Sequence, residues 1–196
     1  MSGPGAPQAP LAKLTVPGPG GWVAHQHSHA FRLEPELHGP ARRVAAPDRD
    51  QVGLLLDLAR TLPEPFHLVY VLLTTRTLRP PGRYQATRPL PRAALTPLLA
   101  RFRDFLEQDG RHHLWLGSAV EPSTLVYDQH QLLYLYGRLE AYQPVLRAAG
   151  MDEGPVVLPE GHRHELHPAF DQAEAELFAA LAWTWNPLEP EDEEVE

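Results

Sequence analysis

The pattern of apolar and polar residues along the chain predicts five short strands in its central part. Residues 66–75 (FHLVYVLLTT) are rich in valine, leucine and aromatic side chains, which is typical of a buried strand, and residues 83–87 can return as its partner. Three further strands are expected at 112–117, 123–127 and 131–136, separated by short polar breaks. Such closely spaced strands indicate a three-stranded antiparallel meander.

Apolar residues at helical spacing predict helices between and after these strands. Leu54, Leu55 and Leu58 repeat on one face of a segment that opens at Asp48 and closes before Pro63. Further helices are expected to begin at Thr96 and to cover residues 139–149 and 168–185. The predicted fold class is therefore α+β, with a mostly antiparallel sheet (the strand pair plus the meander) and three to four packed helices.

Proline, glycine and acidic residues divide the chain into three parts. Residues 1–21 hold five prolines and five glycines and are expected to form a flexible arm. Residues 22–186 contain the apolar pattern and are expected to fold as a single α+β domain. Residues 187–196 carry six carboxylates and are expected to be a disordered acidic tail.

Missing residue types exclude several classes of function. The chain has no cysteine, so disulfides, thiolate metal sites and cysteine nucleophiles are ruled out. Its single lysine, Lys13, lies in the proline- and glycine-rich arm, which argues against a P-loop and against Schiff-base chemistry. The sequence also lacks a secretory pattern and any run of about 20 apolar residues. A cytoplasmic protein is therefore expected, with no membrane partner and no required cofactor.

The formal net charge of -8 is unevenly distributed. Residues 76–111 carry eight arginines against three carboxylates, whereas residues 112–196 carry three arginines against sixteen carboxylates. Arginine greatly outnumbers lysine and isoleucine is absent, a bias typical of a GC-rich bacterial genome. The basic segment lacks the interleaved aromatic residues of nucleic-acid-binding modules, so nucleic-acid binding is not favoured. The acidic tail can fold back over the arginines and compete with an anionic partner.

Histidine is the one enriched polar residue type, with eleven copies. His162, His164 and His167 lie together in the segment HRHELH and are candidate metal ligands. A second group, His25 to His29, alternates so that an extended segment places its histidines on one side. Neither group has the spacing of a known metal motif, and solvated loop histidines are the alternative interpretation.

A second candidate site lies within the predicted meander, at the turn between its second and third strands. His113 with its neighbour His112 opens one strand, while Asp128 and His130 occupy a turn. If the strands pair as predicted, His113, Asp128 and His130 approach one another and can act as an acid–base group. An Asx-turn formed by Asp128 explains this turn without any catalytic role.

Candidate partner-binding residues are found in two places. Trp183 and Trp185 end the last predicted helix and cannot both face one core. Arg76, Arg79 and Arg83 surround a proline-rich turn in the basic segment.

Three functional hypotheses follow from these features. The leading one is a non-enzymatic domain that binds an unknown protein, as an adaptor or an immunity or inhibitor protein does. The first alternative is a histidine-dependent protein that binds a divalent metal, or a metal-dependent hydrolase. The second is an arginine-mediated binder of anions or nucleic acid. The oligomeric state is left open.

Overall fold

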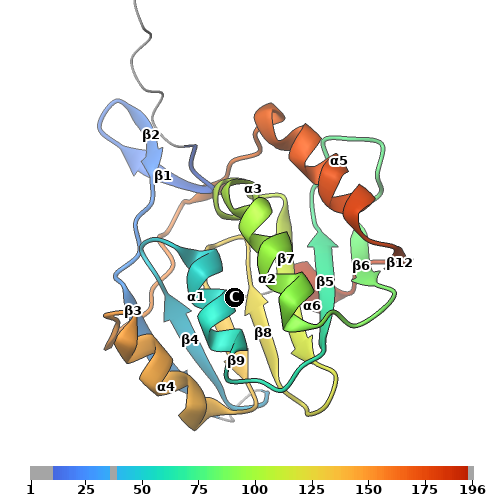
Figure 1. Cartoon of the computed structure of the whole chain (residues 1–196). Helices are drawn as coiled ribbons and strands as arrows, with labels where there is room; N and C mark the ends of the chain where they lie inside the picture. Colours follow the sequence, from blue (N-terminus) through green and yellow to red (C-terminus); the bar gives the residue numbers. More distant parts are fainter. Residues whose placement is uncertain (1–10, 36–38, 194–196) are drawn as a thin grey trace, which may run out of the picture.

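The computed structural model describes residues 11–35 and 39–193, which form two β-sheets and a layer of helices (Figure 1). The larger sheet has nine strands, in the order β10 (Asp152–Glu153), β3 (Ala30–Glu34), β4 (Arg42–Ala46), β9 (Leu133–Tyr136), β8 (Thr124–Tyr127), β7 (His112–Ser118), β5 (Phe66–Leu72), β6 (Gly82–Ala86) and β12 (Trp183–Asn186). Neighbouring strands are antiparallel except β10 and β3, which are parallel.

The smaller sheet joins the N-terminal hairpin to a segment that comes late in the chain. It consists of β11 (Arg163–His164), β1 (Leu14–Gly18) and β2 (Gly21–Ala24), all antiparallel. The β1–β2 hairpin turns through Gly20, whose φ of 87° is readily adopted only by glycine. The β1–β11 pairing brings the histidine-rich segment next to the N-terminal strand.

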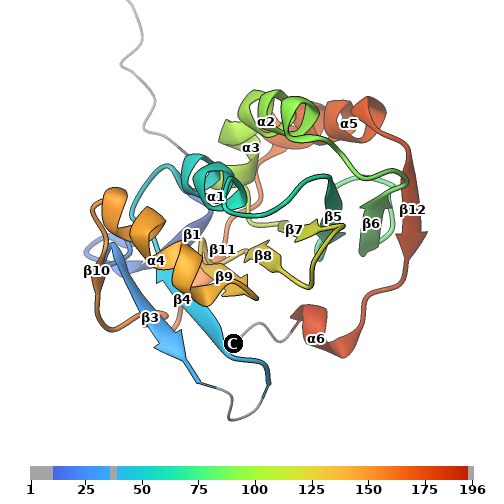
Figure 2. The ribbon, with the colours of Figure 1, turned by 60° about the horizontal axis from the view of Figure 1, so that its bottom comes forward.

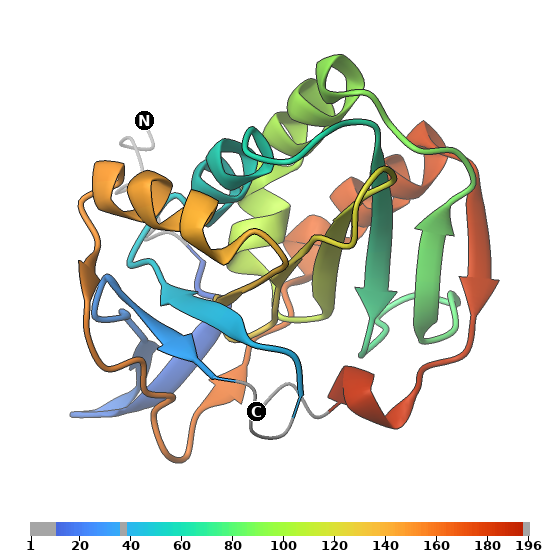
Figure 3. The same ribbon diagram turned by 90° about the horizontal axis from the view of Figure 1, so that it is seen from below.

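Helices cover one face of the nine-stranded sheet, while α6 and the small sheet lie on the other side (Figure 3). The helices of the covered face are α1 (Gln51–Ala59), α2 (Arg92–Arg101), α3 (Arg103–Gln108), α4 (Leu139–Ala148) and α5 (Asp171–Ala180), which follows the 3-10 turn η1 (Pro168–Phe170). The short helix α6 (Pro190–Glu193) comes after β12. Across residues 11–35 and 39–193, no helix is long and apolar enough to cross a membrane.

Period-two alternation of the central strands builds the core. Leu68, Tyr70 and Leu72 of β5 are fully buried and belong to the main apolar cluster, which the helices complete. On the opposite face, Val126 and Tyr134 belong to a smaller buried cluster. The sheet is therefore buried in part on both sides.

The structure combines helices with a mostly antiparallel sheet, in agreement with the α+β class, but the predicted sheet is too small. The strand pair (β5–β6) and the meander (β7–β8–β9) both exist, and the register from Phe66↔Ser118 to Leu72↔His112 joins them into one sheet. Short strands with weak patterns extend it, and the parallel β10–β3 pair makes it mixed. The helices outnumber the three to four expected.

The helix predicted over residues 168–185 is wrong at its C-terminal end. Helix α5 stops at Ala180, and Trp183 and Trp185 lie on β12, which pairs with β6. Aromatic and β-branched residues suit a strand when a partner edge is available, and this tertiary pairing overrides the helical pattern. The Trp183 indole donates a hydrogen bond to the Phe178 carbonyl (3.2 Å), whereas Trp185 is 48% exposed.

Both predicted flexible ends contain ordered structure. Residues 1–10 lie outside the described part, but Lys13 and Leu14 are buried and begin β1, so the folded region starts before residue 22. In the predicted tail, residues 194–196 lie outside the described part. Asp192 of α6 is fully buried and pairs with Arg83 at 2.8 Å, which ties the preceding turn to the domain.

Candidate metal centre

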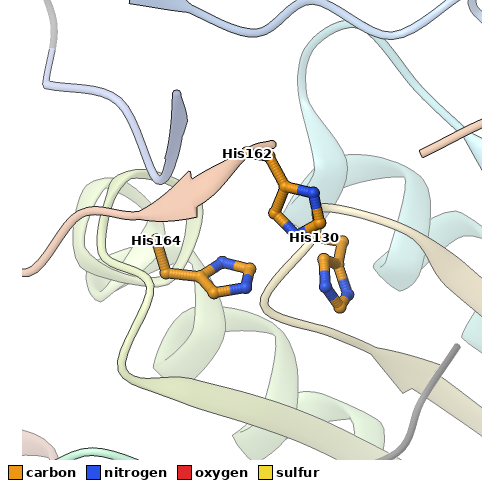
Figure 4. Close-up of side chains that lie close together, drawn as sticks. All are labelled: His130, His162 and His164. Atoms are coloured by element: carbon orange, nitrogen blue, oxygen red, sulfur yellow. The ribbon is translucent and has the colours of Figure 1, made fainter. Parts of the chain in front are cut away.

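Three histidines from two distant parts of the chain converge at one point (Figure 4). His130, His162 and His164 each offer a ring nitrogen, and these three atoms lie within 4.8 Å of one another. Their ring centroids are separated by 5.1 Å (His130–His162), 4.8 Å (His130–His164) and 5.3 Å (His162–His164). His130 is buried and the other two are partly exposed, so the cluster lies at the boundary between protein and solvent.

The turn between β8 and β9 orients His130. One carboxylate oxygen of Asp128, Oδ1, accepts hydrogen bonds from the backbone amides of His130 (2.9 Å) and Leu132 (2.8 Å). This is the Asx-turn geometry that favours aspartate at such positions. The other oxygen, Oδ2, lies 2.7 Å from His130 Nδ1. The Nδ1 proton is therefore directed to Asp128, which leaves Nε2 as the nitrogen available to a ligand.

The small sheet supplies the other two histidines. His164 is part of β11 and pairs with Leu14 of β1, and His162 lies two residues earlier in the chain. Residues two apart in an extended segment point to the same side, which brings both rings toward His130. His162 Nδ1 lies 2.7 Å from the Pro159 carbonyl oxygen, so its Nε2 is also left available.

Gly110 allows β11 to lie close to the nine-stranded sheet. Its amide donates to the Glu165 carbonyl (2.8 Å), and a Cβ at this position would lie only 2.8 Å from the His164 Cβ. Any larger residue would push the segment that carries His164 away from His130. Absence of a side chain at Gly110 thus contributes to the geometry of the cluster.

Electrostatics favour the neutral form of His164 and the ionised form of Asp128. Burial by itself raises the Asp128 pKa, but the His130 hydrogen bond and the nearby imidazoles outweigh this effect and hold the pKa below its usual range. For His164, burial first, and then the neighbouring His130 and His162, lower the pKa to about 3. Metal ions bind the neutral imidazole, so the lowered pKa keeps His164 in the form that a metal requires at neutral pH.

The residues present fit a divalent transition metal. Three imidazoles form a ligand set found in catalytic zinc sites, where a fourth position is left for water or substrate. Tetrahedral zinc with bonds of about 2.0–2.1 Å requires nitrogens about 3.4 Å apart, so small side-chain rotations complete the site. His130 Nδ1 contacts a carboxylate and His162 Nδ1 contacts a backbone carbonyl. Metal-bound histidines usually have such partners on the ring nitrogen that does not bind the metal.

His167, the third histidine of the predicted metal group, is placed outside the cluster. Its Nε2 lies 2.8 Å from the Ala12 carbonyl oxygen, and its backbone amide donates to Asp109 Oδ2 (2.8 Å). Leaving β11, the chain turns toward the buried Asp109 and directs this ring away from His130. The metal group and the acid–base group predicted from the sequence each contribute part of one site, and no spacing in the sequence joins them.

His112 and His113 point to opposite faces of β7. His112 stacks on Tyr70 within the core, with a centroid distance of 4.9 Å, and so lies on the helix-covered face. His113 points to the other face, as does Asp128 at the end of the neighbouring strand. Its imidazole makes no hydrogen bond within the described part of the chain. Burial lowers the His113 pKa to about 4, and the charges of Asp128 and His130 also act on it, so these groups lie near one another without a direct hydrogen bond.

Two more histidines border the cluster. His27 Nε2 lies 2.7 Å from the backbone carbonyl oxygen of His130, and His25 Nε2 lies 3.3 Å from His27 Nδ1. These contacts support the turn that carries His130. His25 and His27 therefore stabilise the site without belonging to the three converging nitrogens.

Among the candidate partner-binding residues, Arg79 and Trp185 lie away from the histidine cluster. Trp185, Arg79 and the fully exposed Leu78 border a shallow groove beside the edge strand β12. The Arg79 guanidinium stacks on the Phe178 ring at 3.5 Å, and Arg76 pairs with Asp171 at 3.2 Å. These arginines are thus engaged by groups of the chain itself.

Comparison with known proteins gives no further guidance. No protein-family model matches the chain, and neither the curated proteins nor the solved structures contain a significant match to it. The functional argument therefore depends on the chemistry of the histidine cluster.

Proposed function

We propose that this protein binds a divalent transition metal ion, with zinc as the best fit, through His130, His162 and His164. The observation that supports this most directly is the convergence of three ring nitrogens within 4.8 Å from separate segments. The Nδ1 atoms of His130 and His162 each lie within hydrogen-bond distance of an oxygen acceptor. This contact favours the tautomer whose Nε2 can bind a metal. The proposal corresponds to the metal-binding alternative among the sequence-based hypotheses.

The ligand set also favours a particular class of metal site. Structural zinc sites are closed by four protein ligands, whereas catalytic sites have three and keep one position open. When bound, the metal would lower the pKa of a coordinated water and so supply a nucleophile for hydrolysis. Asp128 would hold His130 in place and balance part of the metal charge.

Zinc titration of protein purified without a polyhistidine tag tests this proposal. One equivalent of zinc is expected to bind, and His164→Ala is expected to weaken binding by at least about 100-fold because only two ligands remain. Isothermal titration calorimetry measures the affinity, and Co²⁺ substitution reports the coordination geometry by visible absorption. His167→Gln is the matched control, since this histidine lies in the same segment but outside the cluster.

Two results would contradict the metal-binding proposal. The first is the absence of stoichiometric binding of zinc, cobalt or nickel by the wild-type protein. The second is equal metal affinity of the wild type and His164→Ala. Loss of binding in His167→Gln but not in His164→Ala would show that a different set of ligands is used.

Asp128 is expected to tune the metal affinity through His130. Asp128→Asn keeps the size of the side chain but removes its negative charge, so zinc affinity should fall by about 10- to 100-fold. Competition with a chromophoric chelator measures this change. Asp104→Asn removes an exposed carboxylate from α3 and is expected to leave the affinity unchanged. An unchanged affinity in Asp128→Asn would mean that Asp128 only shapes the turn.

Protein binding is the second candidate function. The groove beside β12 favours it, because Leu78 and Trp185 expose large apolar side chains there. In the nine-stranded sheet, three strands separate β12 from β8, whose end carries the metal site. The two functions therefore use different surfaces and can coexist.

A further inference from the structure

Three side chains of β7, those of His112, His113 and Trp115, carry buried ring nitrogens without hydrogen-bond partners within the described residues, and two of them lie on the face opposite the helices. His113 is 1% exposed, and neither of its ring nitrogens is bonded within the described residues; the same is true of the Trp115 indole Nε1. A buried polar group without a partner destabilises the fold, and a group of this kind can mark a place that a ligand or water completes. Residues two apart on a strand share a face, and these two point away from the helices.

Arg83 belongs to the same surface. Val71 of β5 pairs with Arg83 on one side and with His113 on the other, so the three residues form a row across one face of the sheet. At a strand spacing of about 4.8 Å, the Cα atoms of Arg83 and His113 are about 10 Å apart. The Arg83 guanidinium carbon lies 5.0 Å from the centroid of the Trp115 ring, which places a cation above this surface.

A carboxylate of the chain itself pairs with the Arg83 guanidinium. Asp192 is fully buried, and Arg83 Nε donates to its two oxygens at 2.9 and 2.8 Å. Glu189 adds a second carboxylate, 3.0 Å from Arg83 Nη1. Both come from the segment around α6, which lies on the side of the sheet opposite the helices (Figure 2). The surface is thus able to bury a carboxylate, and the acidic end of the chain supplies one.

We propose that His113, Trp115 and Arg83 form a carboxylate-binding subsite beside the metal site, and that Asp192 fills it as an internal ligand. A small carboxylate-bearing molecule would displace Asp192, pair with Arg83 and accept hydrogen bonds from the two ring N–H groups. The ion pair alone does not account for the unpaired nitrogens of His113 and Trp115, which lie on the same face of the sheet as Arg83. The subsite itself contains no metal ligand. The inference therefore depends on the proposed function only where it assigns carboxylates as the ligand class of the metal site.

Succinate titration of the full-length protein, followed by ¹H–¹⁵N NMR of the indole N–H groups, tests the subsite. Trp115→Phe assigns the Trp115 signal. Asp192→Ala removes the internal ligand and is expected to bind succinate at least about ten-fold more tightly than the wild type, with a shift of the Trp115 signal. Adding Arg83→Gln to Asp192→Ala should abolish this gain. Asp192→Asn serves as a second variant if the alanine variant unfolds, and Asp104→Asn is the control for loss of one negative charge.

Three results would overturn the proposal. They are equal succinate affinity with and without Asp192, a Trp115 signal that does not respond, and retained binding in the Arg83→Gln background. Equal binding of sulfate would overturn the assignment to carboxylates. Carrying out the titration with and without zinc separates the two proposals, because succinate binding by a protein that fails to bind metal supports the subsite and contradicts the proposed function alone.

Discussion

Replacing Arg111 with methionine is expected to lower the free energy of unfolding by about 3–5 kcal/mol, because this change leaves buried carboxylates unpaired. Arg111 is fully buried and holds Asp109 with two hydrogen bonds, at 2.7 and 2.9 Å. It also contacts Glu174 (3.3 Å), Asp171 (3.0 Å) and the His167 carbonyl (3.0 Å). Urea unfolding followed by circular dichroism measures the loss.

The position of this network explains the size of the expected effect. Arg111 lies directly before β7, whereas Glu174 belongs to α5 and His167 follows the small sheet. One guanidinium therefore connects three parts of the fold. Burial opposes its charge, but Asp109 first and Glu174 next outweigh burial and raise the Arg111 pKa above its usual value. The arginine consequently stays charged at all accessible pH values.

An exposed arginine provides the matched control for Arg111→Met. Arg101 pairs with Glu176 at 2.6 Å, and both side chains are largely solvent-exposed. Arg101→Met is expected to change stability by less than about 1 kcal/mol. Adding Asp109→Asn and Glu174→Gln to Arg111→Met should recover part of the loss, since the buried charges are then removed together. A single Arg111→Met variant within about 1 kcal/mol of the wild type would show that the network is not stabilising.

Stability is expected to increase by several kcal/mol between about pH 7 and about pH 10 because of Lys13, the only lysine of the chain. Its side chain is 1% exposed, and burial lowers its pKa from 10.5 to about 7 despite the opposing charges of Asp128, Asp109 and Glu107. Nζ donates one hydrogen bond to the Leu106 carbonyl, at 3.0 Å.

The direction of this pH effect follows from proton linkage. Between the folded and unfolded pKa values of Lys13, the unfolded chain binds the proton more strongly, so raising the pH favours the folded state. Below about pH 7 both states are protonated, and the cost of burying the charge is present in full. Above about pH 10.5 both states are neutral, and the cost disappears.

Lys13→Met isolates this contribution from other titrating groups. Methionine keeps the length of the side chain without a charge, but it leaves the Leu106 carbonyl without its partner. The variant is therefore expected to be about 2–3 kcal/mol more stable than the wild type at pH 7. This advantage should shrink as the pH approaches about 10. A stability difference between the two proteins that is independent of pH would show that Lys13 titrates normally.

The fold was predictable where local pattern and tertiary environment agree. The valine, leucine and aromatic residues of segment 66–72 form β5, as their strand preference predicts. The closely spaced strands of the meander also pair as expected. The prediction failed where pairing partners decide the structure. Trp183 and Trp185 continue a helical pattern in the sequence, but they form a strand because β6 offers an edge for antiparallel pairing. Strands as short as β10 carry too few residues to show any pattern.

The candidate site was predictable only in pieces. Histidine enrichment pointed to His130 in one group and to His162 and His164 in another. Their convergence depends on the antiparallel pairing of β1 with β11 and on the close approach at Gly110, neither of which has a sequence signal. For the same reason, the sequence could not show that His167 is directed to the Ala12 carbonyl instead.

By itself, the sequence determined the chemistry that this protein lacks and the residue types available to it. Absence of cysteine and a single lysine exclude thiolate sites and a P-loop, because those sites require particular side chains whatever the fold. Tertiary structure alone decided which histidines meet, which carboxylate pairs with Arg83, and that Lys13 is buried. Each of these depends on contacts between residues far apart in the chain, whereas sequence patterns report only on near neighbours.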